Sequence, residues 1–131
     1  MACFPMTKSS HADRIVALKR GAQAEADALA YLQQQGLTLI ERNFSCPWGE
    51  IDLIMRQAQT LVFVEVRQRS SQRFGGAAAS VGRSKQGRLW RTAEYYLQRY
   101  SQGSARLPAC RFDLFAVDGE QVEWIRDILS H

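Results

Sequence analysis

Hydrophobic and polar residues alternate most clearly at residues 49–69, and this alternation predicts a β-hairpin. In the first strand, three apolar side chains share one face: Ile51, Leu53 and Met55. The opposite face then carries two acids and one apolar residue: Glu50, Asp52 and Ile54. The polar residues 56–60 form a connection short enough for antiparallel pairing with the next strand. A pair of acids is therefore expected on one side of the predicted sheet.

The second strand, residues 61–69, places a further acid opposite the first strand. Its three valines share one face: Val62, Val64 and Val66. The other face carries Leu61, Phe63, Glu65 and Arg67. Antiparallel pairing would bring Asp52 and Glu65 within reach of one cation. Two ionised carboxylates this close need a counter-charge or a shared proton. A divalent metal such as Mg²⁺ would supply the counter-charge, and so would a structural salt bridge from Arg67 to Glu65 or Asp52.

A long helix is predicted before the hairpin, from an N-cap at Asp13 to about Gln35, and Gly36 ends it. Its inward stripe advances in steps of three and four residues: Ile15, Leu18, Ala22, Glu25, Leu29 and Leu32. Glu25 interrupts this otherwise apolar face. A buried carboxylate is costly unless something binds it, so Glu25 is expected either to bind a ligand near the sheet or to pair with a core arginine.

A second helix is predicted from a cap at Ser80 or Ser84 to about Gln102. Its inward side chains are Leu89, Ala93, Tyr96, Leu97 and Tyr100. Lys85 precedes Leu89 by four residues and so lies at the start of this buried stripe. Lys85 is therefore either a residue that reaches toward the acids or an ordinary surface lysine.

The remaining segments complete one α/β domain. Residues 1–12 are polar and irregular, so they are expected to form a disordered arm that precedes a single domain at residues 13–131. Strands are predicted at residues 37–46 and 111–117, and a last short segment follows at 121–129. The predicted class is thus α/β.

Two single residues and one loop have alternative interpretations. We expect Trp48, in a turn, to cover an edge of the core rather than to stack on a base, and Asp113 to be a structural partner for arginine. The Gly-, Ser- and Ala-rich residues 70–80 predict a loop, in which Arg69 and Arg73 would either close over phosphate or remain solvated.

Composition adds little to this picture. The chain has 131 residues, 46% of them hydrophobic, and a formal net charge of +4, which suits a polyanionic partner without identifying one. The bases are fourteen arginines and three lysines, which favours bidentate phosphate contacts or simply reflects Arg-rich codon usage. The three separated cysteines and two histidines argue against a zinc site or a disulfide framework.

The sequence also predicts a cytoplasmic protein without membrane contact. No stretch approaches the roughly 18 apolar residues of a membrane span, and the N-terminal residues lack the apolar core of a secretory signal.

Six ordered motifs carry a resemblance to a known family. They are "GAQAEADALAYLQQQG" at 21–36, "RN" at 42–43, "GEIDLI" at 49–54, "FVEVRQR" at 63–69, "SVGRSKQ" at 80–86 and "RFDLFAV" at 111–117. This pattern, over about residues 14–118, resembles the YraN family of small bacterial proteins, which is similar to archaeal Holliday-junction resolvases within the PD-(D/E)xK nuclease superfamily. The resemblance implies a restriction-endonuclease-like core with a central mixed sheet of four or five strands, two flanking helices and the order α-β-β-β-α-β.

The same resemblance implies a chemistry. Glu25, Asp52, Glu65 and the backbone carbonyl of Val66 would hold Mg²⁺ or Mn²⁺, which would activate water against a DNA phosphate. Resolution of branched DNA needs paired cuts and so implies a homodimer. Further contacts to nucleic acid are expected from three arginines: Arg69, Arg73 and Arg83.

One position departs from the family pattern, because Arg67 stands where the family has a lysine. Arginine stabilises phosphoryl charge but cannot act as a base, since its pKa exceeds about 12. Either metal-bound hydroxide suffices, or Lys85 replaces the missing lysine, or catalysis is lost. The alternatives to a nuclease are therefore a nucleic-acid-binding protein without cleavage and an interaction protein in which these charges form salt bridges only.

Overall fold

The computed structural model describes residues 11–69, 83–101, 108–118 and 121–129. Its elements in chain order are α1 (His11–Gln34), β2 (Thr38–Cys46), β3 (Gly49–Gln57), β4 (Thr60–Arg69), α2 (Arg83–Ser101), β5 (Cys110–Asp118) and β6 (Gln121–Ile125). The order α-β-β-β-α-β is confirmed, and β6 extends it by one strand. Of the disordered arm predicted at residues 1–12, residues 1–10 lie outside the described residues, whereas residues 11 and 12 belong to α1, so the arm does not extend as far as predicted. The loop predicted at 70–80 also lies outside the described residues.

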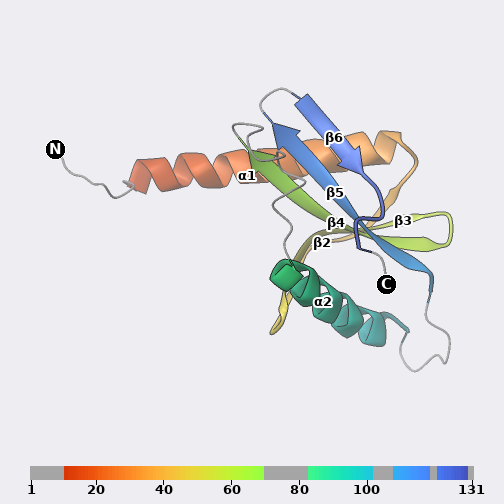
Figure 1. Cartoon of the computed structure of the whole chain (residues 1–131). Coiled ribbons are helices and arrows are strands. Elements are labelled where there is room, and N and C mark those ends of the chain that lie inside the picture. Colours follow the sequence, from red (N-terminus) through yellow and green to blue (C-terminus); the bar gives the residue numbers. More distant parts are fainter. Residues whose placement is uncertain (1–10, 70–82, 102–107, 119–120, 130–131) are drawn as a thin grey trace.

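The five strands form one mixed sheet in the order β2-β3-β4-β5-β6. β4 and β5 are parallel, and the other neighbouring pairs are antiparallel. The helix α2 lies between β4 and β5 in the chain, as a parallel pair of strands requires a crossover connection. The two helices cover opposite faces of the sheet (Figure 1).

The apolar core is divided by the sheet into two layers. On the α2 side, the strand residues Ile54 and Phe63 pack with Leu89 and Tyr96 of the helix. On the α1 side, the buried residues are Ala28, Leu32, Leu37, Leu53, Met55, Val62, Val64 and Phe115. The alternation predicted for β4 is confirmed, because its valines lie on one side of the sheet and Leu61 and Phe63 on the other. β3 agrees except at Ile51, which belongs to the α2 side.

The hairpin is tighter than its polar connection predicts. β3 continues to Gln57, and only Ala58 and Gln59 separate it from Thr60 at the start of β4. Ala58 has a positive φ of 55°, a conformation that two-residue hairpin turns use. This turn fixes the register from Gln57↔Thr60 to Leu53↔Val64.

The helix α1 buries a narrower stripe than predicted. Its buried side chains are Ala24, Ala28 and Leu32, four residues apart, whereas Ala22 is exposed and Leu29 is half-buried. Side-chain size does not select this row, because Ala26 and Ala30 are as small and are exposed; the spacing of four residues places the buried side chains on the one face that meets the sheet. The expected contribution of Ile15 and Leu18 lies outside the side chains that the structure describes.

Both ends of α1 differ little from the prediction. The helix begins at His11, two residues before the predicted cap. Gly36 ends it as expected, with φ +99°, and the amides of Gly36 and Leu37 donate to the carbonyls of Gln33 and Leu32 at 3.1 Å each. These two bonds form the Schellman arrangement, which glycine favours because it adopts positive φ without strain.

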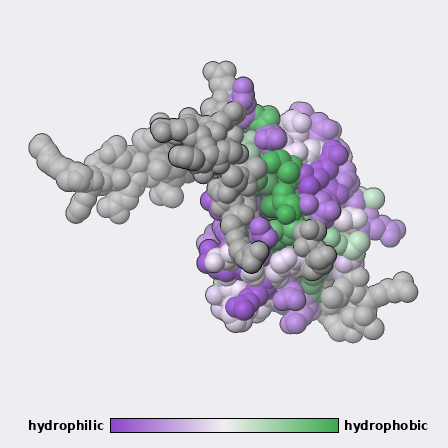
Figure 2. All heavy atoms as spheres, viewed as in Figure 1, coloured by the Kyte–Doolittle hydropathy of each residue, from purple (hydrophilic) through white to green (hydrophobic). Residues whose placement is uncertain are grey.

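The helix α2 begins at Arg83, and its buried residues Leu89, Ala93, Tyr96 and Leu97 confirm the predicted stripe except at Tyr100, which is exposed. In the view of Figure 2, hydrophilic residues cover most of the described surface, and a narrow hydrophobic band runs between them. Within the described ranges, neither helix is long and apolar enough to cross a membrane.

Candidate functional site

The site lies where β3 and β4 separate. Their backbone pairing extends only as far as Leu53↔Val64, so Asp52 and Glu65 are the next residues in the same register. At this point the amide N–H of Val66 donates a hydrogen bond of 2.8 Å to Oδ2 of Asp52. A side chain thus satisfies a backbone donor beyond the last paired residues, and it fixes the direction of the Asp52 carboxylate.

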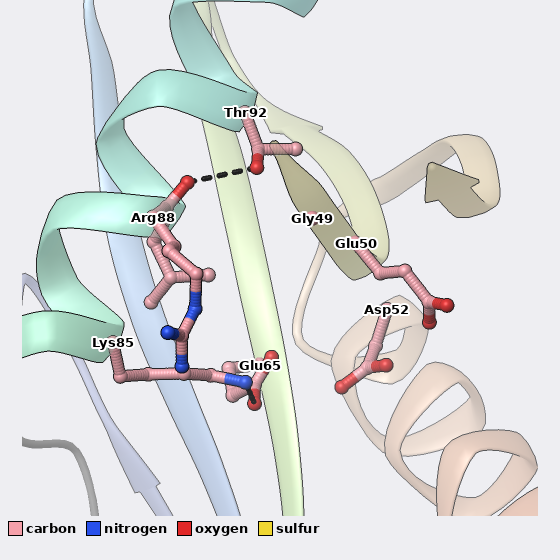
Figure 3. A pocket seen from close by; sticks show the side chains of 8 residues that line it. Gly49, Glu50, Asp52, Glu65, Lys85, Arg88 and Thr92 are labelled. Atoms are coloured by element: carbon pink, nitrogen blue, oxygen red, sulfur yellow. Dashed lines mark hydrogen bonds and ion pairs between the residues drawn. The ribbon is translucent and has the colours of Figure 1, made fainter. Parts of the chain in front are cut away.

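A cavity of about 210 Å³ opens beside these residues. Its lining comes from the start of β3, the second half of β4 and the first turns of α2: Gly49, Glu50, Asp52, Glu65, Lys85, Arg88, Leu89 and Thr92 (Figure 3). We call this space the carboxylate cavity. The structure therefore brings together Asp52, Glu65 and Lys85, three residues that the sequence singled out.

Glu65 is the most deeply placed charge of the carboxylate cavity, with 9% of its side chain exposed. Its Oε2 atom lies 3.1 Å from Lys85 Nζ and 3.4 Å from Arg67 Nε. Lys85 reaches this oxygen from the first turn of α2, as Figure 3 shows. The salt bridge from Arg67 predicted as one alternative is therefore present, and so is the approach of Lys85 toward the acids.

Arg67 contributes an unsatisfied donor to this site. Its Nε atom is buried and, within the described residues, has no hydrogen-bond partner, because the contact with Glu65 lacks hydrogen-bond alignment. A buried donor without a partner costs free energy unless a ligand or water accepts from it. This buried N–H thus has only its ion-pair contact with Glu65.

Asp52 is the most perturbed acid of the site. Burial and the negative charge of Glu65 raise its pKa from 3.8 to about 7, and the charge of Glu25 adds to the effect. The hydrogen bond from the Val66 amide opposes this rise, because it favours the ionised form. Near neutral pH the Asp52 carboxyl is thus only partly ionised, and a cation, which binds the ionised form, would displace the remaining proton.

Glu25 lies on α1, half-buried, and approaches Asp52 closely enough for its charge to be felt. The described residues contain no group of three or more Asp, Glu, His or Cys side chains gathered closely enough to hold a metal ion. Asp52 and Glu65 still match the one or two carboxylates, completed by water, with which proteins commonly bind Mg²⁺. Metal ligation by Glu25 and by the Val66 carbonyl remains a prediction.

The side chains of the three arginines that were predicted to contact nucleic acid lie outside the part of the chain that the structure describes. Arg73 lies in residues 70–82, and the side chains of Arg69 and Arg83 also lie outside the described part of the chain. Their roles remain predictions.

Sequence reasoning missed two residues of the carboxylate cavity on α2. Arg88 and Thr92 follow Lys85 by three and seven residues, a spacing that places all three on one helical face, so the position of Lys85 could have identified them. The hydroxyl of Thr92 donates to the Arg88 carbonyl at 2.8 Å. Gly49 faces Thr92 so closely that a Cβ atom on this glycine would lie 3.2 Å from Thr92 Oγ1.

Two other expectations had opposite outcomes. Trp48 does not cover the core: 47% of it is exposed, and its ring packs instead against the guanidinium of Arg91, 5.3 Å from the ring centroid. Asp113 is a structural partner of arginine, as predicted, because it is fully buried and its Oδ1 lies 3.0 Å from Arg111 Nε.

Comparison with known proteins identifies relatives for most of the chain. Residues 24–117 match a family model described as "Uncharacterised protein family UPF0102". The chain is 54% identical over 110 residues to a UPF0102 protein of Janthinobacterium sp. (strain Marseille), covering 84% of this chain and 86% of the relative. It is 51% identical over 120 residues to a UPF0102 protein of Shewanella loihica, covering 92% and 96%. A third relative, from Ralstonia nicotianae, is 56% identical over 111 residues, covering 82% and 83%.

Proposed function

The chain belongs to the uncharacterised protein family UPF0102, the YraN-like family that its motifs indicated, and on that premise we propose that it is a metal-dependent endonuclease acting on DNA. One observation carries the proposal: Asp52 and Glu65 converge on a cavity that also receives Lys85. Two acids and a lysine are the groups with which the nuclease superfamily that this chain resembles cleaves phosphodiesters.

The two acids would hold one Mg²⁺ or Mn²⁺ ion. Asp52 offers Oδ1 while Oδ2 remains bound to the Val66 amide, and Glu65 offers its carboxylate from β4. The bound metal would supply a Lewis acid that lowers the pKa of water and neutralises charge on the phosphate. Glu25, on α1, would add a ligand or hold one of the metal's waters.

Lys85 would take the place of the lysine that the family carries at position 67. Its ammonium group already lies beside the Glu65 carboxylate, so it can orient a water or a phosphate oxygen there. Arg67, which forms an ion pair with Glu65, would help to neutralise negative charge on the phosphate, without acting as a base. Arg88, on the same helix, extends this cationic wall of the cavity.

Branched DNA is the substrate that the similarity to resolvases favours, and a homodimer is the assembly that paired cuts require. The charge of the chain supports a polyanionic partner in general, since α2 alone carries five basic residues and one acid.

A second candidate is a nucleic-acid-binding protein that does not cleave. The observation in its favour is that Glu65 is neutralised by two cations, Arg67 and Lys85, without any metal. In such a protein the ion pairs would complete the site, and Asp52, with its pKa raised to about 7, would be only partly ionised near neutral pH.

Calorimetric titration with Mn²⁺ distinguishes the two candidates without knowledge of the substrate. The titration is done at about pH 8, where the Asp52 carboxyl, with its pKa near 7, is ionised. We expect binding in the wild type and its loss in Asp52→Asn and Glu65→Gln. The matched control is Glu123→Gln, since Glu123 is an exposed acid on β6, the far edge strand, and its removal should leave binding unchanged.

The outcome decides the next step. Binding that requires both Asp52 and Glu65 warrants a screen of branched, flapped and single-stranded DNA for cleavage. Absence of Mn²⁺ binding in the wild type would contradict the nuclease proposal and favour the non-catalytic protein.

A further inference from the structure

A second recess lies on α2 beside the carboxylate cavity, and we propose that it binds a single unpaired nucleobase. Its volume is about 290 Å³, and it is lined by Trp48, Arg91, Glu94, Tyr95 and Gln98. We call it the tryptophan recess. The inference rests on the proposed function, because it specifies which part of a nucleic acid lies next to the carboxylate cavity.

The shape and chemistry of the tryptophan recess fit a planar aromatic ligand. Trp48 exposes 47% of its surface and belongs to neither core layer. Tyr95 provides a second aromatic side chain in the same lining. The volume is about ten times the roughly 30 Å³ that one water occupies, so the recess has room for more than solvent. Exposed aromatic rings in such a setting are typical stacking partners for bases.

Its position relates it to the carboxylate cavity. Trp48 directly precedes Gly49, and Arg91 directly precedes Thr92, while Gly49 and Thr92 both line the carboxylate cavity. The 3.2 Å separation between Thr92 Oγ1 and a Cβ placed on Gly49 shows that β3 and α2 meet there. The two spaces therefore flank one contact between these elements, so a nucleotide adjoining a phosphate in the carboxylate cavity lies near Trp48.

The charges of the lining favour a base over a phosphate. The tryptophan recess contains one cation, Arg91, and one acid, Glu94. The guanidinium carbon of Arg91 lies over the Trp48 ring, 5.3 Å from its centroid, so this cation already has a partner in the recess. Arg88 and Lys85 in the carboxylate cavity offer two cations, so a phosphate would bind there in preference to the tryptophan recess. The carboxylate of Glu94 can accept a hydrogen bond from an exocyclic amine at a base edge.

This arrangement selects for nucleic acid with an unpaired nucleotide. A base inside a duplex is stacked on both sides and cannot reach a protein ring without being extruded, which costs a few kcal/mol. A single strand, a flap or a junction offers bases without that cost. Stacking on one aromatic side chain contributes about 1–3 kcal/mol per base, which corresponds to roughly a 5- to 150-fold change in affinity.

The test compares Trp48→Leu with Trp48→Phe in the full chain. Affinities for a labelled single-stranded thymidine oligonucleotide and for a duplex of the same length are measured by fluorescence anisotropy at low salt, with EDTA present so that no cleavage occurs. We expect Trp48→Leu to weaken single-strand binding by about fivefold or more and to change duplex binding by less than about twofold, while Trp48→Phe retains most of the single-strand affinity. Val122→Ser is the matched control, because Val122 is 51% exposed on the opposite edge strand.

Three results would overturn the inference: no oligonucleotide binding by the wild type, unchanged single-strand binding by Trp48→Leu, or equal losses for single strand and duplex. Circular dichroism verifies that each variant is folded. The proposed nuclease is judged separately by Mn²⁺ titration, so either idea can fail while the other stands.

Discussion

Lys85 and Glu65 form an ion pair of 3.1 Å that joins the first turn of α2 to β4. The same carboxylate oxygen of Glu65 lies 3.4 Å from Arg67, its neighbour on the strand. The cation beside Glu65 that comes from α2 is the one that we propose to replace the strand lysine of the nuclease pattern. The ammonium group occupies the cavity in which a phosphate oxygen or water beside Glu65 would lie.

Lys85→Met is expected to lower cleavage of a DNA substrate by about a hundredfold or more, because it removes the cation that orients and stabilises the reacting groups. Mn²⁺ affinity should be retained or tightened, since the ammonium competes with the metal for Glu65. Initial cleavage rates and Mn²⁺ calorimetry, measured on the same preparation, check both effects. If Lys85 had only a structural role, its replacement would lower the cleavage rate and the Mn²⁺ affinity together.

Two further variants make this prediction decisive. Arg56→Met removes an exposed base of β3 that does not line the carboxylate cavity, so its cleavage rate should equal that of the wild type. Arg67→Lys restores the family's residue on the strand. Unchanged cleavage by Lys85→Met would refute the role of Lys85, and a marked gain of activity in Arg67→Lys would show that position 67 remains the catalytic one.

Asp52 is expected to make the folded protein less stable as the pH rises from about 4 to 7. Its pKa is 3.8 in its ordinary state and about 7 in the folded protein, so between these values the folded state holds a proton that the unfolded state has lost. The contribution of Asp52 to stability is therefore largest below about pH 4 and is lost as the pH rises through 7. Asp52→Asn removes this dependence and keeps an acceptor for the Val66 amide.

Urea-induced unfolding across this pH range provides the measurement. Relative to the wild type, Asp52→Asn should be more stable at about pH 8, by on the order of 1–3 kcal/mol, and should show no advantage near pH 4. Glu123→Gln is the control for removal of a surface acid. If the stability curves of the wild type and Asp52→Asn ran parallel across the range, the cause assigned to the raised pKa of Asp52 would be wrong.

Asp113 is expected to be a determinant of stability and not of metal binding. Fully buried in β5, it accepts hydrogen bonds from Arg111 Nε at 3.0 Å, from Trp124 Nε1 at 2.9 Å and from the Asp127 amide at 3.0 Å. Asp113→Ala leaves the partly buried guanidinium and two further donors without this acceptor, so we expect a loss of about 3–5 kcal/mol in the free energy of unfolding.

Thermal and urea unfolding test this loss, with Asp113→Asn as the milder variant that keeps one acceptor oxygen. Mn²⁺ affinity, measured below the unfolding transition, should not change. A metal-binding defect in folded Asp113→Asn would contradict the purely structural role.

Local pattern was sufficient for the order of the elements and for the two faces of β4, whereas in β3 it placed Ile51 on the wrong side of the sheet. The period of two in β4 separates its valines from Phe63 and Glu65, because adjacent side chains of a strand must point to opposite faces. Gly36 marked the end of α1 because few other residues adopt its positive φ without strain. The register that brings Asp52 next to Glu65 could not be fixed from the sequence, because the predicted connection at residues 56–60 is longer than the two-residue turn of the structure, and a slip of one residue reverses the face of every side chain.

Local pattern did not predict which side chains are buried where the contact between two elements decides their burial. In the described part of α1 the buried row is Ala24, Ala28 and Leu32, whereas the equally small Ala22, Ala26 and Ala30 are exposed, so only the packing of the helix on the sheet identifies its inner face. Trp48 is exposed although its residue type favours burial, and only the position of Arg91 on a different element explains where its ring lies.

The sequence by itself thus determined the family, the order of elements and the two acids of the hairpin, because periodicity, turn residues and motif spacing are properties of neighbours in the chain. Tertiary structure alone decided that Lys85 reaches Glu65, that the pKa of Asp52 rises to about 7 and that Trp48 lines a recess beside the carboxylate cavity. Each of these depends on how closely α2 and the separated ends of β3 and β4 approach one another, a distance that no local pattern encodes.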